Sequence, residues 1–436
     1  MIVRIAALLV IAGSILFGAK AQAAEAQTMQ FVTSAAALTT LDGSKIPFVH
    51  LTGYYAGSPK GGGDFIWQPS AGGSPDSCTV FSAGAGPGHW LRQLPNSLLD
   101  VTMCGAKWDG AADDGAAITA AFGVASRDGY TLTCPGGTGR IATTVAPANF
   151  RNVVLRCQGM NASTIACDVP AGRACFLFQN INGLEEVQAP QLYDLSFTVR
   201  AGPRPPGAVI QYNSMPGGFT DSAATQSYMM RPVVQRVRII GGTIGILCAK
   251  CFDGDFSLNE MMNQQRHGID LEGSDWMSIG DAGTNRIKGS GGYPIVLASH
   301  GTFGNGNLVS HNDILAPAVG VDAYIYSSAR TAYIEKNFLE GATSGACEIK
   351  IDKGAIHATV RDNHVTDRTV KNWLCVVPLL RQAEFSDNQT TSHGQGAALF
   401  LNRGSWKDFL LQRAPIHFGN WSEAGFPGWW WLAGFP

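Results

Sequence analysis

Charged residues are scarce in this sequence. Asp, Glu, Lys and Arg together make up 15% of the 436 residues, against about a quarter in an average soluble domain. The formal net charge is −2, and no basic run stands out. Because nucleic-acid binding depends on clustered Lys and Arg that neutralise phosphates, we expect no nucleic-acid partner.

Several catalytic and nucleotide-binding motifs are also missing. The sequence has no nucleophile elbow, no Walker loop and no HExxH motif. These motifs are typical of α/β-hydrolases, P-loop NTPases and zinc peptidases. We therefore expect no nucleotide partner and no cofactor, with calcium as the one exception considered below.

A hydrophobic run long enough to cross a membrane is absent after the N-terminus. At the N-terminus itself, Arg4 precedes an apolar segment over residues 5–19 and small residues at 21–23. This is the pattern of a cleaved export signal, and the apolar segment is short for a membrane span. We expect residues 1–23 to be removed, so that a secreted or periplasmic chain begins near Ala24. An uncleaved anchor is the alternative.

Glycine, in contrast, is abundant, with 53 residues, and 45% of the sequence is hydrophobic. That hydrophobic content excludes intrinsic disorder. Many glycines and few charges suit an all-β chain with many tight turns.

Asparagine recurs at an almost constant interval in the second half of the chain. Successive members are 25–27 residues apart, and most follow an apolar residue three positions earlier, such as Phe256 or Ile334. A period of this size is typical of a solenoid. A column of asparagines, each hydrogen-bonded to the coils above and below, fits a parallel β-helix, and such a rod suits a long polysaccharide. The six members are Asn259, Asn285, Asn312, Asn337, Asn363 and Asn388.

All ten cysteines lie beyond the predicted signal, and an even count in an exported chain indicates disulfides. Stacked coils are about 4.8 Å apart, which is close enough for a bridge. The pairs separated by about one coil, and hence the candidate bridges, are Cys134 with Cys157 and Cys347 with Cys375. The CxxC at 248–251 is alternatively a redox motif or half of a zinc site.

The segments 105–110 (GAKWDG) and 113–118 (DDGAAI) resemble the opening of β-helices in the pectate-lyase superfamily, which includes polygalacturonase-like proteins and phage tailspikes. Trp108 and Gly115 depart from the usual motif, and Gly139 replaces an aromatic residue in the next family feature. The resemblance implies a right-handed parallel β-helix. In this superfamily the opening motif is structural, so its aspartates are not assigned as catalytic.

These observations predict four segments. After the signal, residues 24–96 form a small Gly-rich β segment whose aromatics are either its core or a sugar platform. Residues 97–405 form the β-helix, opened by an amphipathic capping helix after Asp113 and Asp114, which suit its N-cap. Residues 406–436 are Trp-rich and form either a closing cap or a contact surface.

One outward face of the predicted helix carries the first candidate site. Asp270 and Glu272 are two apart on one strand, so both point outward about 7 Å apart, within the range of an inverting acid/base pair. We expect Ile269 and Leu271 to point inward in a stack that ends with Leu399 and Leu401. The predicted substrate-binding neighbours on the outward face are Lys250, His267, His300, Glu348, Lys350 and Asp352.

A second charged column flanks the asparagines. His311, Lys336, Asp362 and His364 would stack at coil spacing. A base beside a cation is what β-elimination from a uronic acid requires. The alternative is a solvated face whose charges pair between coils.

Calcium is a further possibility on the first face. Asp270 and Glu272, together with Asp275 and Asp281, make a partial set of the carboxylates that calcium-dependent pectate lyases gather there.

We therefore predict an exported enzyme that degrades or modifies a polysaccharide, by carboxylate acid/base hydrolysis through Asp270 and Glu272 in a groove of the β-helix. A polysaccharide lyase acting by β-elimination is the close alternative, and a non-catalytic carbohydrate-binding or envelope scaffold is the third. A polysaccharide is the expected partner, and a homotrimer is a candidate assembly.

Overall fold

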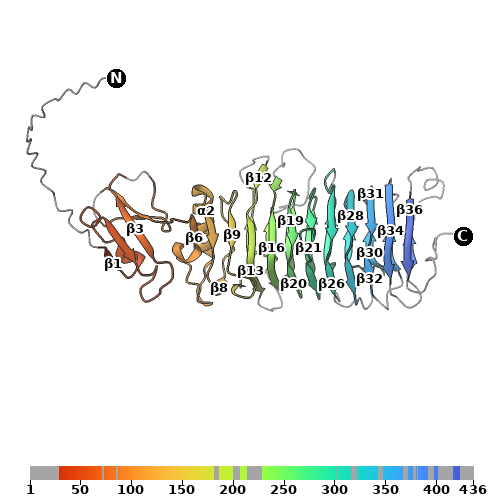
Figure 1. Cartoon of the computed structure of the whole chain (residues 1–436), viewed down its shortest axis with the longest axis horizontal. Coiled ribbons are helices and arrows are strands. Elements are labelled where there is room, and N and C mark those ends of the chain that lie inside the picture. Colours follow the sequence, from red (N-terminus) through yellow and green to blue (C-terminus); the bar gives the residue numbers. More distant parts are fainter. Residues whose placement is uncertain are drawn as a thin grey trace, which may run out of the picture.

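The computed structural model describes residues 29–422, except for 71–72, 85–86, 181–185, 200–206, 214–227, 301, 316–320, 322, 342–346, 367–371, 377–379, 381, 391–396 and 401–415. The predicted export signal and most of the predicted Trp-rich cap lie outside the described residues. A small sheet stands at one end of a long rod of stacked strands (Figure 1).

The small sheet has the strand order β1-β2-β3-β5-β4 and a short helix, α1. Val49, Leu51, Phe65 and Trp90 are at most 1% exposed and belong to a core separate from that of the rod. Phe65 and Trp90 are therefore core residues and not part of a sugar platform. The elements are β1 (Gln30–Val32), α1 (Ala35–Leu38), β2 (Phe48–Leu51), β3 (Gly63–Gln68), β4 (Val80–Ser82) and β5 (His89–Arg92).

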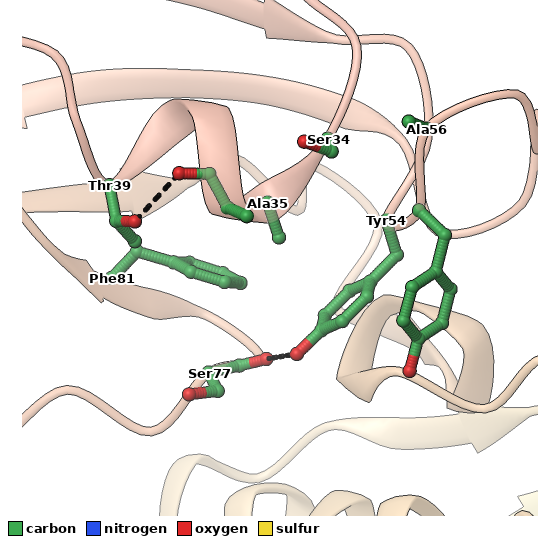
Figure 2. A pocket seen from close by; sticks show the side chains of 9 residues that line it. Ser34, Ala35, Thr39, Tyr54, Ala56, Ser77 and Phe81 are labelled. Atoms are coloured by element: carbon green, nitrogen blue, oxygen red, sulfur yellow. Dashed lines mark hydrogen bonds between the residues drawn. The ribbon is translucent and has the colours of Figure 1, made fainter.

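A cavity of about 440 Å³ opens beside α1 (Figure 2). Tyr54 and Phe81 line it, and the Tyr54 hydroxyl donates a hydrogen bond to the carbonyl of Ser77 at 3.2 Å. Tyr55 also lines the cavity, and its hydroxyl donates to the carbonyl of Gly105 in the first coil of the rod at 2.9 Å. Both tyrosines thus make structural hydrogen bonds.

The rod begins with a 3-10 helix, η1 (Val101–Cys104), and with α2 (Gly115–Asp128). The buried face of α2 includes Ile118 and Phe122, which covers the apolar end of the rod as predicted for a capping helix. Asp114 holds the N-cap position but makes no side-chain bond to its own helix. Its carboxylate instead accepts from the backbone N–H of Lys107 at 2.6 Å, which fixes the turn before the helix.

Parallel strands in three sheets form the rest of the rod. Each coil adds one strand to the nine-stranded sheet, and many coils add two strands to the largest sheet, one on each side of the asparagine bend. The described chain is therefore a parallel β-helix. The nine-stranded sheet contains β11 (Phe176–Phe178), β14 (Ala208–Tyr212), β17 (Ile244–Ala249), β21 (His267–Glu272), β24 (Ile295–Ala298), β27 (Ile325–Ser327), β30 (Cys347–Ile351), β33 (Asn372–Val376) and β35 (Ala397–Phe400). The three-stranded sheet contains β12 (Glu186–Gln188), β15 (Tyr228–Met230) and β18 (Cys251–Phe252).

The third sheet has nineteen described strands and includes the asparagine bends. Its strands are β6 (Leu98–Asp100), β7 (Thr131–Thr133), β8 (Gly137–Ile141), β9 (Val154–Arg156), β10 (Ser163–Cys167), β13 (Gln191–Val199), β16 (Val233–Ile240), β19 (Asp255–Ser257), β20 (Glu260–Met262), β22 (Ser278–Ile279), β23 (Arg286–Lys288), β25 (Asn307–Ser310), β26 (Asp313–Leu315), β28 (Thr331–Glu335), β29 (Phe338–Glu340), β31 (His357–Arg361), β32 (His364–Val365), β34 (Gln382–Thr390) and β36 (Ile416–Ser422).

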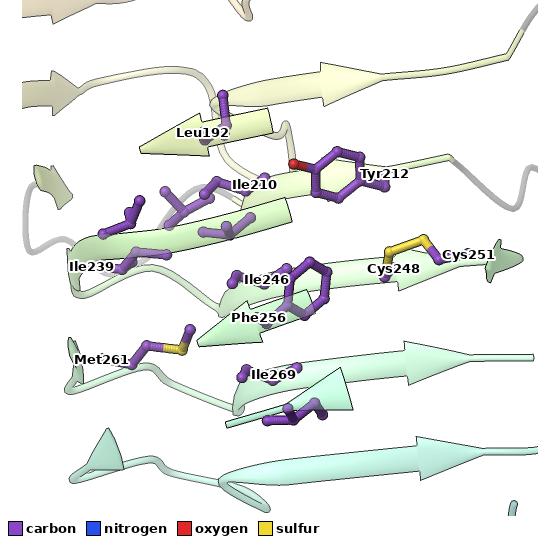
Figure 3. Close-up of a cluster of buried hydrophobic side chains, with 14 of the residues drawn as sticks. Leu192, Ile210, Tyr212, Ile239, Ile246, Cys248, Cys251, Phe256, Met261 and Ile269 are labelled. Atoms are coloured by element: carbon purple, nitrogen blue, oxygen red, sulfur yellow. A yellow bond between two sulfur atoms is a disulfide. The ribbon is translucent and has the colours of Figure 1, made fainter. Parts of the chain in front are cut away.

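The core is a stack of buried side chains, mostly aliphatic and aromatic (Figure 3). Ile246 pairs in register with Ile269 on the next coil, and the series continues through Ile295. At its far end the register differs from the prediction, because Leu374 pairs with Ala398 and not with Leu399. A register shift between Asn372 and Leu374 accounts for the one-residue difference, since a slip of one residue exchanges the two faces of a strand.

The predicted asparagine ladder is confirmed. All six members are at most 1% exposed. The Nδ2 of Asn337 donates to the Oδ1 of Asn363 and to the carbonyl of Val309, both at 2.9 Å. The same side chain-to-side chain bond joins Asn312 to Asn337 and Asn363 to Asn388. Each bend therefore satisfies its buried polar groups through the next coil.

Both predicted disulfides are present, and the CxxC forms a third. Across the described residues no cysteine is free. The bridges are Cys78–Cys104, Cys134–Cys157, Cys167–Cys175, Cys248–Cys251 and Cys347–Cys375. The first joins the small sheet to the first coil of the rod.

None of the helices in the described part of the chain is long and apolar enough to span a membrane.

Candidate active site

Two rows of outward side chains run along the nine-stranded sheet, and we call them together the site face. Their neighbours in the strands, such as Ile269 and Leu271, are fully buried in the core, so the alternate residues point out. The first row is Leu247, Asp270, Val296, Tyr326 and Lys350. The second row is Ala249, Glu272, Ala298, Ser328 and Asp352, of which the last two directly follow the paired residues Ser327 and Ile351.

Asp270 and Glu272 form a coupled carboxyl pair on this face. Asp270 is only 5% exposed, and its Oδ1 has no hydrogen-bond partner among the described residues. Burial, followed by the charge and the hydrogen bond of Glu272, raises the pKa of Asp270 to about 8. At neutral pH Asp270 is therefore mostly protonated and donates to the Glu272 carboxylate.

The Glu272 carboxylate has a second contact. His300 Nε2 lies at hydrogen-bond distance from Glu272 Oε2. On the two adjacent coils the residues beside Glu272 are Ala249 and Ala298, so no large side chain stands next to it in its row. The arrangement is that of two carboxyl groups that share a proton because they lie too close to ionise together.

This geometry differs from the predicted one in two respects. The carboxyl groups are within hydrogen-bond reach and not about 7 Å apart, because side chains two apart on a strand can tilt together when they share a proton. The nearest basic side chain is also different. His300 contacts Glu272, whereas Lys250 lies one coil back with its Nζ 5.8 Å from the ring centroid of Phe303. The catalytic roles of Asp270 and Glu272 stay predictions.

An aromatic stack borders the carboxyl pair. His267 stacks on Tyr293 with ring centroids 5.8 Å apart, and Tyr293 stacks on Tyr326 at 4.9 Å. Burial lowers the pKa of His267, which favours its neutral form. Both tyrosines were missed as site residues, although each lies in or just before a strand of the nine-stranded sheet.

The aromatic stack ends beside three polar residues that were predicted to bind substrate. Lys350 Nζ lies 5.8 Å from the ring centroid of Tyr326 and 3.8 Å from Asp352 Oδ2. Glu348, predicted to bind substrate on the same face, is fully buried instead. Tyr324, beside Glu348 on the preceding coil, is equally buried. The start of these two strands is therefore not accessible to a substrate.

The second predicted column lies at the asparagine bend. His311, Lys336 and Asp362 have φ of 54°, 57° and 55°, so each holds a left-handed conformation at the turn before its asparagine. Within the described residues no ion pair joins them. His364 stacks on Phe338 with centroids 5.2 Å apart.

Charges on the neighbouring strands of that face pair between coils. Arg361 contacts Glu335 at 2.6 Å, and Arg286 contacts Asp313 at 3.2 Å. This is what the solvated-face interpretation predicts. The carboxyl pair of the site face is therefore the stronger candidate for chemistry.

The four carboxylates considered for calcium do not gather at one point. Asp275 Oδ1 accepts from the backbone N–H groups of Gly304 and Asn305, at 2.7 and 2.5 Å. Among the residues that the structure describes, no cluster of three His, Cys, Asp or Glu side chains could hold a metal ion. The donor set thus does not fit a calcium site, and we derive no step through a metal.

A second cavity, of about 640 Å³, lies on the first coils, where Asp100, Thr133 and Arg156 line it. It belongs to the nineteen-stranded sheet and contains no residue of the site face.

Both parts of the chain are similar to phage tail proteins. Residues 31–95 match the family model of the phage tail protein small four-stranded β-sheet domain. No curated protein matches the sequence. The full-length tailspike protein 2 from Escherichia coli O157:H7 bacteriophage CAB120 is similar over 89% of this chain and 49% of its own, with TM-score 0.59 and 13% identity. This chain thus spans about half the length of that tailspike.

Two further tailspikes are similar over more of their own length. Gp49 from Acinetobacter baumannii bacteriophage Fri1, a capsular polysaccharide depolymerase, has TM-score 0.53 and 14% identity, covering 91% of this chain and 76% of its own. The tailspike of Acinetobacter phage vB_ApiP_P1 has TM-score 0.53 and 16% identity, covering 92% and 73%. The chain therefore has the fold of the phage tailspikes, a right-handed parallel β-helix preceded by a small β-sheet segment.

Proposed function

We propose that this protein cleaves a polysaccharide by acid/base hydrolysis on the site face. The observation that carries the proposal is the carboxyl pair. A buried Asp270, kept protonated by its surroundings, contacts a Glu272 that accepts from His300. The similar tailspike gp49 is a capsular polysaccharide depolymerase, which supports a polymeric glycan as the substrate class.

In this mechanism substrate binding separates the two carboxyl groups, because an inverting pair needs about 6.5–9.5 Å between them to leave room for the attacking water. Each carboxyl group then has one role. Asp270 donates its proton to the glycosidic oxygen as the bond from carbon to that oxygen breaks. Glu272, oriented by His300, takes a proton from the water that adds to the sugar carbon. Proton transfer by one positioned acid or base contributes about 10²–10⁴-fold to a rate.

Conservative substitutions test these roles. We expect Asp270→Asn and Glu272→Gln each to lower turnover at least about a hundredfold without loss of the fold, checked by circular dichroism. His311→Ala and Lys336→Ala are the matched controls, because the elimination hypothesis would place its base there. Turnover is measured on capsular polysaccharides, exopolysaccharides and pectins through new reducing ends.

The same assay separates the rival functions. Ultraviolet absorbance detects the unsaturated sugar that only β-elimination produces. Loss of activity in the two controls but not in the carboxylate variants would assign the site to the asparagine bend and refute the hydrolase. No cleavage of any polymer would favour the scaffold. Export and assembly as a homotrimer remain part of the proposal.

A further inference from the structure

We propose that the site face carries a second subsite, centred on Lys350, that binds a sugar carboxylate about three coils from the cleaved bond. This inference rests on the proposed function, and it narrows the substrate from polysaccharides in general to acidic ones.

The Lys350 ammonium is held in place but lacks hydrogen bonds. Its side chain is 24% exposed, and the distance of 3.8 Å to Asp352 Oδ2 is too long for a hydrogen bond. Among the described residues Lys350 Nζ donates none. The side chain is thus mostly covered, and its ammonium keeps donors available for a further acceptor.

Asp352 does not fill this role, because other donors already bind its oxygens. The backbone N–H of Lys353 donates to Oδ1 at 2.7 Å, and the Tyr326 hydroxyl donates to Oδ2 at 3.2 Å. These bonds fix the Asp352 carboxylate beside Lys350. An incoming carboxylate would give Lys350 a hydrogen bond in which both partners are charged, whereas a neutral sugar hydroxyl would give the hydrogen bond without the attraction between opposite charges.

The distance from the subsite to the carboxyl pair follows from the strand register. Lys350 is in the same row as Asp270, with Val296 and Tyr326 between them. Three coils at about 4.8 Å each place the two residues about 14 Å apart. In the second row Ala298 and Ser328 lie between the two ends, so small side chains follow the path. A glycan lying along the rod would reach both.

Binding can be measured without cleavage. In an Asp270→Asn background, affinity electrophoresis compares polygalacturonate, alginate and xanthan with the same polymers after carbodiimide-mediated reduction of their carboxyl groups. We expect tighter binding to at least one acidic polymer than to its reduced form. Lys350→Met, which keeps the length of the side chain, should weaken binding to that acidic polymer at least about tenfold and leave binding to the reduced form unchanged.

A neighbouring lysine provides the control. Lys353 is an exposed neighbour in sequence, so Lys353→Met removes the same charge without touching the subsite. Equal losses in both variants would mean unspecific charge attraction and would overturn the subsite, as would equal binding of all acidic and reduced polymers. Xanthan carries glucuronate and pyruvate ketals, and mild acid removes only the ketals. Binding that survives this treatment assigns a uronate, and binding that is lost assigns the ketal.

The proposed hydrolysis and the proposed subsite can be refuted separately. If wild type cleaves an acidic polymer and its reduced form equally well, and Lys350→Met does not raise KM for the acidic polymer, the subsite is wrong and the hydrolase stands. If binding depends on Lys350 but no polymer is cleaved, the hydrolase is wrong and the subsite stands.

Discussion

Replacing Asp270 by Asn should stabilise the protein at neutral pH while it abolishes most of the activity. Burial and the neighbouring Glu272 raise the pKa of Asp270 to about 8, whereas an unfolded chain has an Asp pKa near 3.9. Between about pH 4 and pH 8 the unfolded state therefore binds fewer protons than the native state. By linkage, the stability of the wild type falls as pH rises through this window, and it levels off above about pH 8.

The size of the effect follows from the shift. Each pKa unit corresponds to about 1.4 kcal/mol, so the native carboxyl costs up to about 4 kcal/mol at pH 7 and almost nothing at pH 4. Relaxation and water entry around a buried ion reduce such penalties, and we expect Asp270→Asn to gain about 2–4 kcal/mol at pH 7. Asn is neutral at every pH, and its amide still donates to Glu272.

The gain in stability is measured by thermal unfolding of the wild type and the Asp270→Asn variant between pH 4 and pH 9. The gain should appear as a rise in Tm of a few degrees at pH 7 that shrinks to nothing at pH 4. Asp253→Asn is the control, because Asp253 is 54% exposed and pairs with Arg231 at 3.0 Å. It should change stability by less than about 0.5 kcal/mol. A Tm difference that is absent at pH 7, or that does not depend on pH, would mean that Asp270 is ionised in the native state and is not the acid.

Three further outcomes are expected. Asn337→Leu should lower the free energy of unfolding by about 1–3 kcal/mol, since buried backbone groups lose their partners; an unchanged Tm would contradict the ladder's role in stability. Peptide mapping under non-reducing conditions should find Cys134 linked to Cys157 and Cys347 linked to Cys375, and free thiols at all four positions would reject the oxidised-compartment inference. Chelation by EDTA should leave turnover on the active polymer unchanged, and a loss restored by calcium would show that a metal takes part.

The fold could be predicted because it repeats. One asparagine in each coil must meet the same buried backbone groups, so Asn312, Asn337 and Asn363 recur at nearly one spacing and mark the bend directly. The left-handed backbone at His311 and Lys336 could not be predicted in the same way, because Lys does not favour it and His, although enriched there, mostly adopts other conformations. Those two residues were predicted as members of an alternative catalytic column or of a solvated face, and in the structure both lie at the turn before an asparagine.

The site could be predicted only in part. Strand alternation correctly placed Asp270, Glu272 and Lys350 on one outward face. It did not predict that Asp270 is buried or that His300 reaches Glu272, because both depend on side-chain direction and on the segments between strands. These segments vary in length from coil to coil and do not follow the repeat.

The contrast between the two outer faces is the best argument for where the chemistry lies. At the asparagine bend, charges such as Arg361 and Glu335 are paired between coils, at little cost to stability. On the site face, Asp270 is buried with a raised pKa, which lowers stability at neutral pH. The sequence has few charged residues, yet it keeps the unfavourable Asp270 carboxyl in a β-helix that disulfides and a buried asparagine ladder stabilise. Local features that lower stability are expected at functional sites, and among the described residues the carboxyl pair fits that expectation more closely than the bend.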